Sequence, residues 1–232
     1  MEIRRSAERF VTSESWLESR HSFSFGPYYD PTNLGFGFLV AHNDDTVAPG
    51  TGFDPHPHQD LEIITWVLQG ALAHRDSEGH TGVVHPGLVQ RMTAGSGIRH
   101  SEWNDGPDPV HYLQMWIRPD RLDLPPSYAQ STVDLSTGEL TPVVSGLAHH
   151  APSTPIRLHQ HSAGLSAARL APSQTVLVPE APHVHIFIAK GSAELEGLGV
   201  LGTADAARLT NTGGHRLTAG AQGAEVLIWE MH

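Results

Sequence analysis

The chain has 232 residues, of which 39% are hydrophobic and 17% charged, so it can bury a substantial core and is not a disordered polypeptide. Its 14 basic and 25 acidic residues give a formal net charge of −11, which argues against direct binding to nucleic acid. The absence of cysteine excludes disulfides, thiolate catalysis and Cys-ligated zinc. We find neither a secretory signal nor an apolar run of membrane-spanning length, and therefore expect a cytoplasmic protein without membrane contact.

The first half of the chain is predicted to consist of short strands separated by turns, with almost no helical periodicity. Apolar, β-branched and aromatic residues bounded by glycine and proline are typical of such strands. The expected elements in chain order are a helix suggested over 13–19, a strand, turn and strand over 22–41, turns at 43–45 and 47–50, strands at 61–68 and 71–75, a segment 82–90 broken by a turn at 86–87, and strands at 90–94 and 111–117.

The second half repeats this pattern more weakly. The segment 183–191 is similar in style to 56–70, and Thr-Ala-Gly at 218–220 repeats Thr-Ala-Gly at 93–95. A repeat at a spacing of about 125 residues favours a duplicated β-barrel. Proline-rich 119–126 is the best connection, so we predict an all-β fold of two barrels with domains at 1–124 and 125–232.

Two short segments carry the most informative chemistry. His56 and His58 form a His-x-His pair with Glu62 just beyond it, and His100 and Glu102 are spaced in the same way. Side chains at i and i+2 leave the same face of a strand, so two adjacent strands could direct three imidazoles and a carboxylate at one point. Such a donor set suits a divalent transition metal.

The spacing is weak evidence by itself, because the chain has 17 histidines. At that frequency about one His-x-His pair is expected by chance, and three occur, at 56/58, 159/161 and 183/185. The pair at 159/161 is expected to lie in a loop. The residues around each pair must therefore decide which of them has a function.

The surroundings of the first pair resemble the cupin motifs. Gly50, His56, His58 and Glu62 fit the first motif, with Gly70 one residue late. Gly97, His100 and Asn104 fit the second motif, whereas Gly95 and Val89 replace its usual proline and first glycine. The stretches FDPHPHQDLEIITWVLQGALAHRDSEGHTG and VHPGLVQRMTAGSGIRHSEWN are similar to the pirin family, which consists of two-domain bicupins. The resemblance is strong over residues 1–125 and looser beyond, and it implies two jelly-roll barrels.

This resemblance implies a ligand set of His56, His58, His100 and Glu102. In many other cupins the carboxylate ligand is the acidic residue of the first motif, which is Glu62 in this chain. The two-residue period of a strand does not decide between Glu62 and Glu102. We favour Glu102 as the ligand and expect Glu62 to hydrogen-bond a ligand imidazole. The implied metal is Fe(II), with Mn, Ni, Cu and Zn as alternatives.

The bacterial members of the family that the chain resembles are described as quercetin 2,3-dioxygenases. The resemblance thus implies an enzyme, expected to be a monomer, that cleaves a flavonol-like aromatic substrate with dioxygen. Glu102, or nearby Glu62, could accept the substrate's hydroxyl proton. The alternatives are a metal-dependent regulatory binding protein without turnover and a different metal-dependent reaction on a small polar metabolite.

The second domain is expected to lack a metal site. Aligning the two Thr-Ala-Gly segments places Glu225 opposite His100 and Leu227 opposite Glu102, so the ligand set around His183 and His185 is incomplete. The candidates for an apolar pocket beside the first-domain metal are Phe23, Phe25, Phe36, Phe38, Trp66 and Met115, although each of these also suits an ordinary core.

Overall fold

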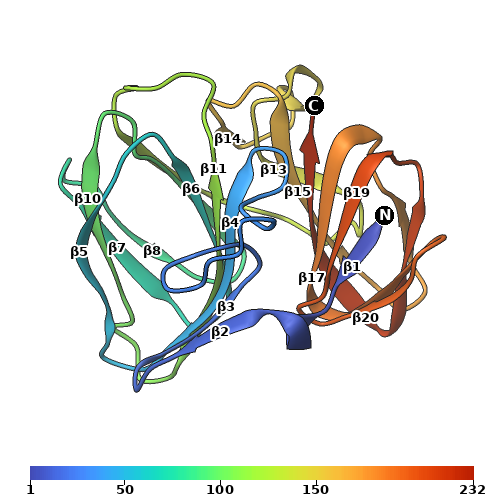
Figure 1. Cartoon of the computed structure of the whole chain (residues 1–232), viewed down its shortest axis with the longest axis horizontal. Coiled ribbons are helices and arrows are strands. Elements are labelled where there is room, and N and C mark those ends of the chain that lie inside the picture. The colour runs from blue at the N-terminus through green and yellow to red at the C-terminus, as the bar shows by residue number, and fades with distance from the viewer. The chain divides into compact units, whose positions relative to one another are not determined.

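The computed structural model describes residues 1–232 and confirms the all-β prediction (Figure 1). The chain divides into two compact units, Phe10–Val133 and Asp134–His232 together with Met1–Arg9. These limits differ from the expected domains 1–124 and 125–232 at two places. Strand β12 (Ser127–Thr132) pairs with β9 (Leu88–Thr93) of the first unit, and β1 (Glu2–Arg4) pairs with β19 (Ala206–Thr212) of the other. Main-chain pairing, which the sequence does not reveal, decides both assignments.

The unit Phe10–Val133 consists of two sheets. The seven-stranded sheet has the order β12-β9-β6-β11-β4-β3-β2, its remaining members being β2 (Phe10–Ser13), β3 (Leu17–His21), β4 (Leu39–Val47), β6 (Glu62–Gln69) and β11 (Val110–Ile117). The four-stranded sheet has the order β5-β10-β7-β8, with β5 (Gly52–His58), β7 (Leu72–Asp76), β8 (Thr81–Val84) and β10 (Ile98–Trp103). Two antiparallel sheets of this kind are the layers of a jelly-roll barrel.

The apolar residues of this unit form its core. Strand β6 is buried along its length up to the exposed Gln69, as its apolar sequence predicts. One cluster gathers Val67, Leu72, Val110 and Tyr112 with further buried side chains. The strands predicted near 61–68, 71–75, 90–94 and 111–117 are therefore confirmed as β6, β7, β9 and β11, with bounds that differ by a few residues.

Three local predictions were wrong. No helix forms over 13–19, where a turn joins β2 to β3. The segment 22–38 holds isolated bridges in place of regular strands. The expected turn at 43–45 lies within β4, because its buried polar side chains find partners across the sheet: Asn43 bonds His21 and Asp44 bonds His111.

The other unit has one nine-stranded sheet that turns about two long strands. Its path is β1-β19-β17-β20-β15-β13-β14, with β16 paired to β20 and β18 to β17. The members not yet given are β13 (Thr141–Ser145), β14 (Ile156–Arg157), β15 (Ala163–Leu170), β16 (Thr175–Leu177), β17 (Ala181–Leu195), β18 (Gly199–Gly202) and β20 (Arg216–Met231); the 3₁₀ turns are η1 (Ser6–Glu8) and η2 (Ala148–His150). The predicted strand at 183–191 is thus confirmed within β17.

Glycine allows β17 and β20 to change partners along their length. Gly191 has φ +75° at a register shift in β17, and a Cβ there would meet the carbonyl of Gly223, which also has φ +75°. Beyond this point β20 pairs with β16 at one end and with β15 at the other. The apolar side chains enclosed in this way, Val184, Ile186 and Ile228 among them, form one buried cluster.

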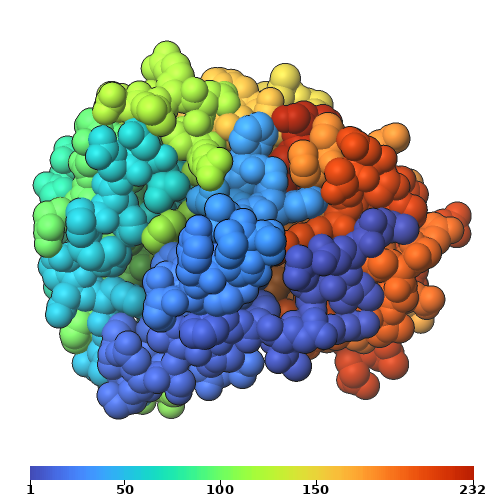
Figure 2. Space-filling view, in the orientation of Figure 1, coloured from blue at the N-terminus to red at the C-terminus, as the bar shows by residue number.

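The first residues of the chain are anchored in this second unit. Arg5 Nη1 donates to Asp205 Oδ2 at 2.6 Å, and the backbone N–H of Ser6 donates to Oδ1 at 2.8 Å. Figure 2 shows the blue N-terminal residues lying against orange residues of the same unit. No helix is long and apolar enough to span a membrane.

Candidate metal centre

Strand β10 directs two of the predicted ligands inward. Its residues alternate strictly, with Ile98, His100 and Glu102 buried and the residues between them more exposed. This is the pattern of a strand with one face on the core. The i, i+2 prediction for His100 and Glu102 is therefore consistent with the structure, and a bulge in the pairing with β5 lies between them.

Strand β5 supplies the other two histidines from the edge of the four-stranded sheet. Its exposed residues Pro55 and Pro57 lack an N–H, which an edge strand tolerates because that side has no partner. His56 lies opposite His100 in the antiparallel pairing. The prolines thus face outward while the alternate residues, His56 and His58, face the barrel.

The three imidazoles converge. One ring nitrogen from each of His56, His58 and His100 lies within 4.8 Å of the others. The Nε2 atoms of His58 and His100 are buried and have no hydrogen-bond partner. Buried polar atoms are almost always paired, so two unpaired nitrogens directed at one point fit a metal ion as their common partner.

Hydrogen bonds fix the tautomers needed for such binding. His56 Nδ1 lies 2.8 Å from the carbonyl of Asp54, to which it donates, leaving Nε2 free. His100 Nδ1 lies 3.4 Å from Nδ1 of His74, and His74 Nε2 donates to Asp76 at 3.2 Å. Because His74 carries its proton on Nε2 in this arrangement, its Nδ1 is free to accept the proton of His100 Nδ1. The Nε2 atom of His100 is then unprotonated, and its lone pair faces the cluster.

Burial and neighbouring imidazoles keep His58 and His100 neutral by lowering their pKa values. Burial, together with the neighbouring His100 and His56, lowers the pKa of His58 to about 3. Burial and the neighbouring His56 and His74 lower the pKa of His100 to about 3, although Asp76 opposes this shift. Burial also opposes ionisation of Asp76, but hydrogen bonds from His74 and His80 outweigh it and lower its pKa. Neutral imidazoles are the form that binds metals.

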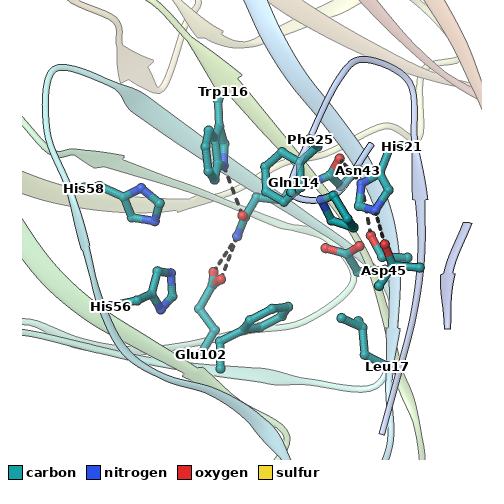
Figure 3. Close-up of a pocket in the computed structure, with 15 residues that line it drawn as sticks. Leu17, His21, Phe25, Asn43, Asp45, His56, His58, Glu102, Gln114 and Trp116 are labelled. Carbon is teal, nitrogen blue, oxygen red and sulfur yellow. Dashed lines mark hydrogen bonds between the residues drawn. The ribbon is translucent and has the colours of Figure 1, made fainter. Parts of the chain in front are cut away.

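Glu102 faces the same cavity from beside the cluster. Its two carboxylate oxygens accept from Nε2 of Gln114 at 2.8 and 2.7 Å, and Gln114 Oε1 accepts from the Trp116 indole at 3.0 Å (Figure 3). Burial raises the pKa of Glu102, while Gln114, His74 and His56 act in the opposite direction. Gln114 and Trp116 lie on β11, so the opposing sheet holds this carboxylate.

Glu62 lies elsewhere. It is fully buried at the start of β6, accepts from Thr93 Oγ1 at 3.0 Å and is close enough to Arg91 to influence its pKa. It belongs neither to the histidine cluster nor to the cavity lining. The structure thus brings His56, His58 and His100 together and places Glu102 beside them in the cavity, outside the group with metal-binding geometry.

Several residues of the site were missed in the sequence. His74 and Asp76 on β7, and Gln114 and Trp116 on β11, repeat the i, i+2 spacing that identified the ligands. That spacing was a usable signal for the His-x-Asp pair. Nothing in the sequence, however, indicates that Gln114 crosses to Glu102 from another sheet.

The cluster opens into a cavity of about 280 Å³ between the two sheets of this unit. That volume is near the lower end of small-molecule pockets, roughly 300–1,000 Å³. Its walls are largely apolar and aromatic and contain neither arginine nor lysine; they comprise Thr12, Leu17, Ser19, His21, Phe25, Gly26, Pro27, Asn43, Asp45, Phe53, His56, His58, Glu102, Gln114 and Trp116. Figure 3 shows His56 and His58 on one side and His21, Asn43 and Asp45 on the other.

The predicted aromatic lining is only partly found. Phe25 lines the cavity, whereas Phe23, Trp66 and Met115 are almost completely buried core residues, and Phe36 and Phe38 are outside the lining. Phe53 and Trp116, which were not among the predicted residues, supply the other aromatic parts of the cavity wall. Asn104, which matches the second cupin motif, donates to the carbonyls of Val47 and Asp108 and accepts from Gly106 N–H, so it braces the loop after β10.

In the second unit, the position aligned with His100 has a different partner. Glu225 accepts from the guanidinium of Arg169 at 2.9 Å, which engages its carboxylate in an ion pair. His183 and His185 belong to neither of the two side-chain groups with metal-binding geometry. His159 and His161 lie outside the strands, as expected.

The sequence of this chain is similar to those of known proteins. The pirin family model matches residues 3–117. A Mycobacterium tuberculosis protein named "putative quercetin 2,3-dioxygenase" is 52% identical over 100% of this chain and 95% of its own length. The Escherichia coli protein named quercetin 2,3-dioxygenase is 37% identical over 84% of each chain.

Solved structures have a similar fold. The crystal structure of YhhW from Escherichia coli matches with a TM-score of 0.91 and 33% identity, covering 100% of this chain and 97% of that one. The structure of bacterial pirin YhhW in complex with nickel(II) matches with a TM-score of 0.90 and 32% identity, covering 99% and 98%. The fold is that of a two-domain cupin with a candidate site for a divalent metal. The chain belongs to the pirin family.

Proposed function

We propose that this protein is a metal-dependent dioxygenase that cleaves the heterocyclic ring of quercetin-like flavonols. The observation that carries the proposal is the aromatic cavity that opens onto the histidine cluster. A planar aromatic substrate suits walls formed by Phe25, Phe53 and Trp116. The absence of arginine and lysine from the lining disfavours the alternative of a different metal-dependent reaction on a small polar metabolite.

The proposed metal ligands are His56, His58, His100 and Glu102. When bound, the metal would supply a Lewis acid that binds and orients the substrate's hydroxyl oxygen. Iron(II) is the proposed metal, and the relative solved with nickel(II) supports a divalent ion in general. Three imidazoles and a carboxylate form a donor set that first-row metals accept.

The protein's own groups would bind and deprotonate the substrate. Glu102 is the proposed acceptor of the hydroxyl proton, since its carboxylate faces the cavity and burial raises its pKa. On the opposite wall, His21 bonds Thr12 at 2.9 Å and Asn43 at 3.0 Å, which leaves a polar rim for the outer hydroxyls of a flavonol. We propose that the enzyme acts as a cytoplasmic monomer.

The decisive experiment is reconstitution of metal-free protein with Fe(II) under anaerobic conditions, followed by quercetin and dioxygen. Oxygen uptake, quercetin loss and carbon monoxide release in equal amounts are expected only with metal present. A lack of metal-dependent oxygen uptake would contradict the proposal and favour a binding role for the site.

The proton-accepting role has its own test. Glu102→Gln keeps the shape of the side chain but removes its basicity, and we expect turnover to fall roughly 100-fold or more at equal metal content. Glu62→Gln is the matched control, because Glu62 is equally buried but lies outside the cavity. Unchanged turnover in Glu102→Gln that has retained its metal would remove the role.

A further inference from the structure

A second cluster of histidines surrounds a carboxylate in the unit that contains the C-terminal half of the chain. Glu230 lies near the end of β20, His232 follows just after that strand, and His149 and His150 come from η2. The nearest distances from the Glu230 oxygens are 3.2 Å to His149 Nε2, 3.9 Å to His150 Nε2 and 2.7 Å to His232 Nε2. Two segments remote in sequence thus meet at one carboxylate.

The charge of Glu230 requires a partner. Its side chain is only 10% exposed, and its ion-pair partners are imidazoles, not lysine or arginine. A nearly buried carboxylate is costly unless a positive charge compensates it. Protonated imidazoles or a cation could provide that charge, and the geometry favours a cation.

The spacing matches a coordination shell. The ligand atoms of His149, His150 and Glu230 all lie within 4.8 Å of one another. Tetrahedral zinc with bonds near 2.0–2.1 Å separates its ligands by roughly 3.3 Å, and the measured separations of 3.2 and 3.9 Å bracket that value. The 3.9 Å separation is too long for a hydrogen bond, so His150 is better placed as a metal ligand than as a donor.

His150 is held in the orientation that ligation needs. Its Nδ1 lies 3.0 Å from Ser145 Oγ, which also accepts from the N–H of Leu147 at 3.1 Å. Donation from Nδ1–H to that hydroxyl leaves the Nε2 lone pair directed at Glu230, as in sites where a hydrogen bond orients a metal-ligating histidine.

The backbone provides the necessary space. Gly164 on β15 lies directly opposite Glu230, and a Cβ there would clash first with Ser145 Oγ and would also come within 2.9 Å of His150 Nδ1. Gly164 does not have a positive φ, so glycine is needed here for the space that Ser145 and His150 occupy, not for its backbone conformation. The backbone N–H of His232 is fixed to the carbonyl of Ser162 at 2.8 Å.

We propose that His149, His150 and Glu230 form a second metal site of zinc type, distinct from the site in β5 and β10. His232, whose Nε2 lies 2.7 Å from Glu230 Oε1, holds that carboxylate in place by a hydrogen bond. Three protein ligands leave the fourth position of a tetrahedral ion to water. Bound metal would tie η2 to the end of β20. Imidazole and carboxylate ligands select late first-row divalent ions such as Zn(II) over magnesium or calcium.

The test is Zn(II) binding to chelator-stripped protein without a polyhistidine tag, measured by equilibrium dialysis and metal analysis. We expect two zinc ions per chain in the wild type and one in His149→Ala/His232→Ala. These two side chains are 58% and 41% exposed, so their removal should leave the fold intact. The control His85→Ala/His215→Ala, which removes two histidines from other places, should bind two.

The variant His56→Ala/His58→Ala separates this site from the one in the proposed function. It should keep one zinc ion, which the further change Glu230→Gln should remove. In the same background, Co(II) should give visible d–d absorption that disappears with Glu230→Gln. Equal zinc content and affinity in the wild type and in His149→Ala/His232→Ala would overturn the second site. Loss of one zinc ion in His56→Ala/His58→Ala reports on the first site only, and the zinc ion that remains in that variant is the one assigned to the second site.

Discussion

At the scale of single residues, the least expected feature of the site is the support that Glu102 receives from the opposing sheet. The sequence identified Glu102 by its spacing from His100, but its only side-chain hydrogen-bond donor is Gln114, which also accepts from Trp116. A buried carboxylate without such a donor would pay the full cost of desolvation. The orientation of Glu102 therefore depends on a residue from a different strand and sheet.

We expect Gln114→Leu to lower the affinity of the first site for Fe(II) roughly 10–100-fold, as changes to residues that orient a ligand typically do. Loss of the hydrogen bonds to a buried carboxylate should also destabilise the fold by about 1–3 kcal/mol. Metal titration and chemical denaturation measure the two effects. The exposed Gln130→Leu serves as control, and equal metal affinity in both variants would show that Gln114 does not position Glu102.

At the scale of elements, close approach of β5 and β10 determines whether the two ligand pairs meet. Gly52 on β5 lies opposite Trp103 on β10, and a Cβ on Gly52 would come within 2.7 Å of Trp103 Cα. The Gly52 backbone does not have a positive φ, so this glycine is needed for space. The motif match identified Gly50, whereas the close approach to β10 is made by Gly52, which the sequence did not single out.

Gly52→Ala should therefore push β5 away from β10, cost about 1–3 kcal/mol of unfolding free energy and weaken metal binding. Gly202→Ala is the matched control, because its Cβ would meet Asp205 Oδ2 at an ordinary 3.8 Å. Thermal unfolding and metal titration of both variants test the prediction. Full metal affinity in Gly52→Ala would show that the strand separation is not critical.

The attachment of the first nine residues to the second unit predicts an acid-sensitive contribution to stability. Burial opposes the ionisation of Asp205, but the N–H of Ser6, Arg5 and the N–H of Gly202 outweigh it and lower its pKa below the ordinary 3.8. Because the folded pKa is depressed, this contribution is complete above the unfolded pKa and is lost as the pH falls through the folded one.

Asp205→Asn should lower stability by about 1.5–3 kcal/mol at neutral pH, the range for hydrogen bonds to a charged group. The difference from the wild type should shrink as the pH falls from about 5 to about 2, because the wild-type carboxylate becomes protonated. Urea unfolding across that range measures it, with exposed Asp105→Asn as control. A difference that is independent of pH would contradict the assigned charge interaction.

At the scale of the whole molecule, the two units can be followed separately by fluorescence. Four of the five tryptophans lie in the unit Phe10–Val133, namely Trp16, Trp66, Trp103 and Trp116, and Trp229 lies in the other. Tryptophan emission therefore reports mainly on the unit that carries the first metal site.

Metal at 100 times its dissociation constant should stabilise that unit by about 2.7 kcal/mol, because a ligand that binds only the folded state shifts the unfolding equilibrium. The tryptophan-detected transition of His149→Ala/His232→Ala should then move to higher temperature on addition of Fe(II) under anaerobic conditions and return on chelation. A transition that does not move with metal would show that the three imidazoles do not hold the ion.

The sequence by itself determined the all-β class, most strand positions and the grouping of His56, His58 and His100. These follow from local rules, since hydrophobic patterning, turn residues and the two-residue period of a strand act over a few neighbours. Family resemblance then favoured Glu102 over Glu62 as the proposed carboxylate ligand, a choice that periodicity could not make.

Only the tertiary structure decided the limits of the units, the support of Glu102 by Gln114, the cavity walls and the cluster around Glu230. Each of these depends on which strands pair and which sheets face each other. The wrong prediction of a turn at Asn43 and Asp45 has the same origin. Polar residues indicate a turn when only their neighbours in sequence are considered, but in the fold both side chains line the cavity and Asn43 bonds His21 across the sheet, so both residues remain in β4. Contacts between residues distant in the chain override local preference, because burial and hydrogen bonding are satisfied over the whole fold.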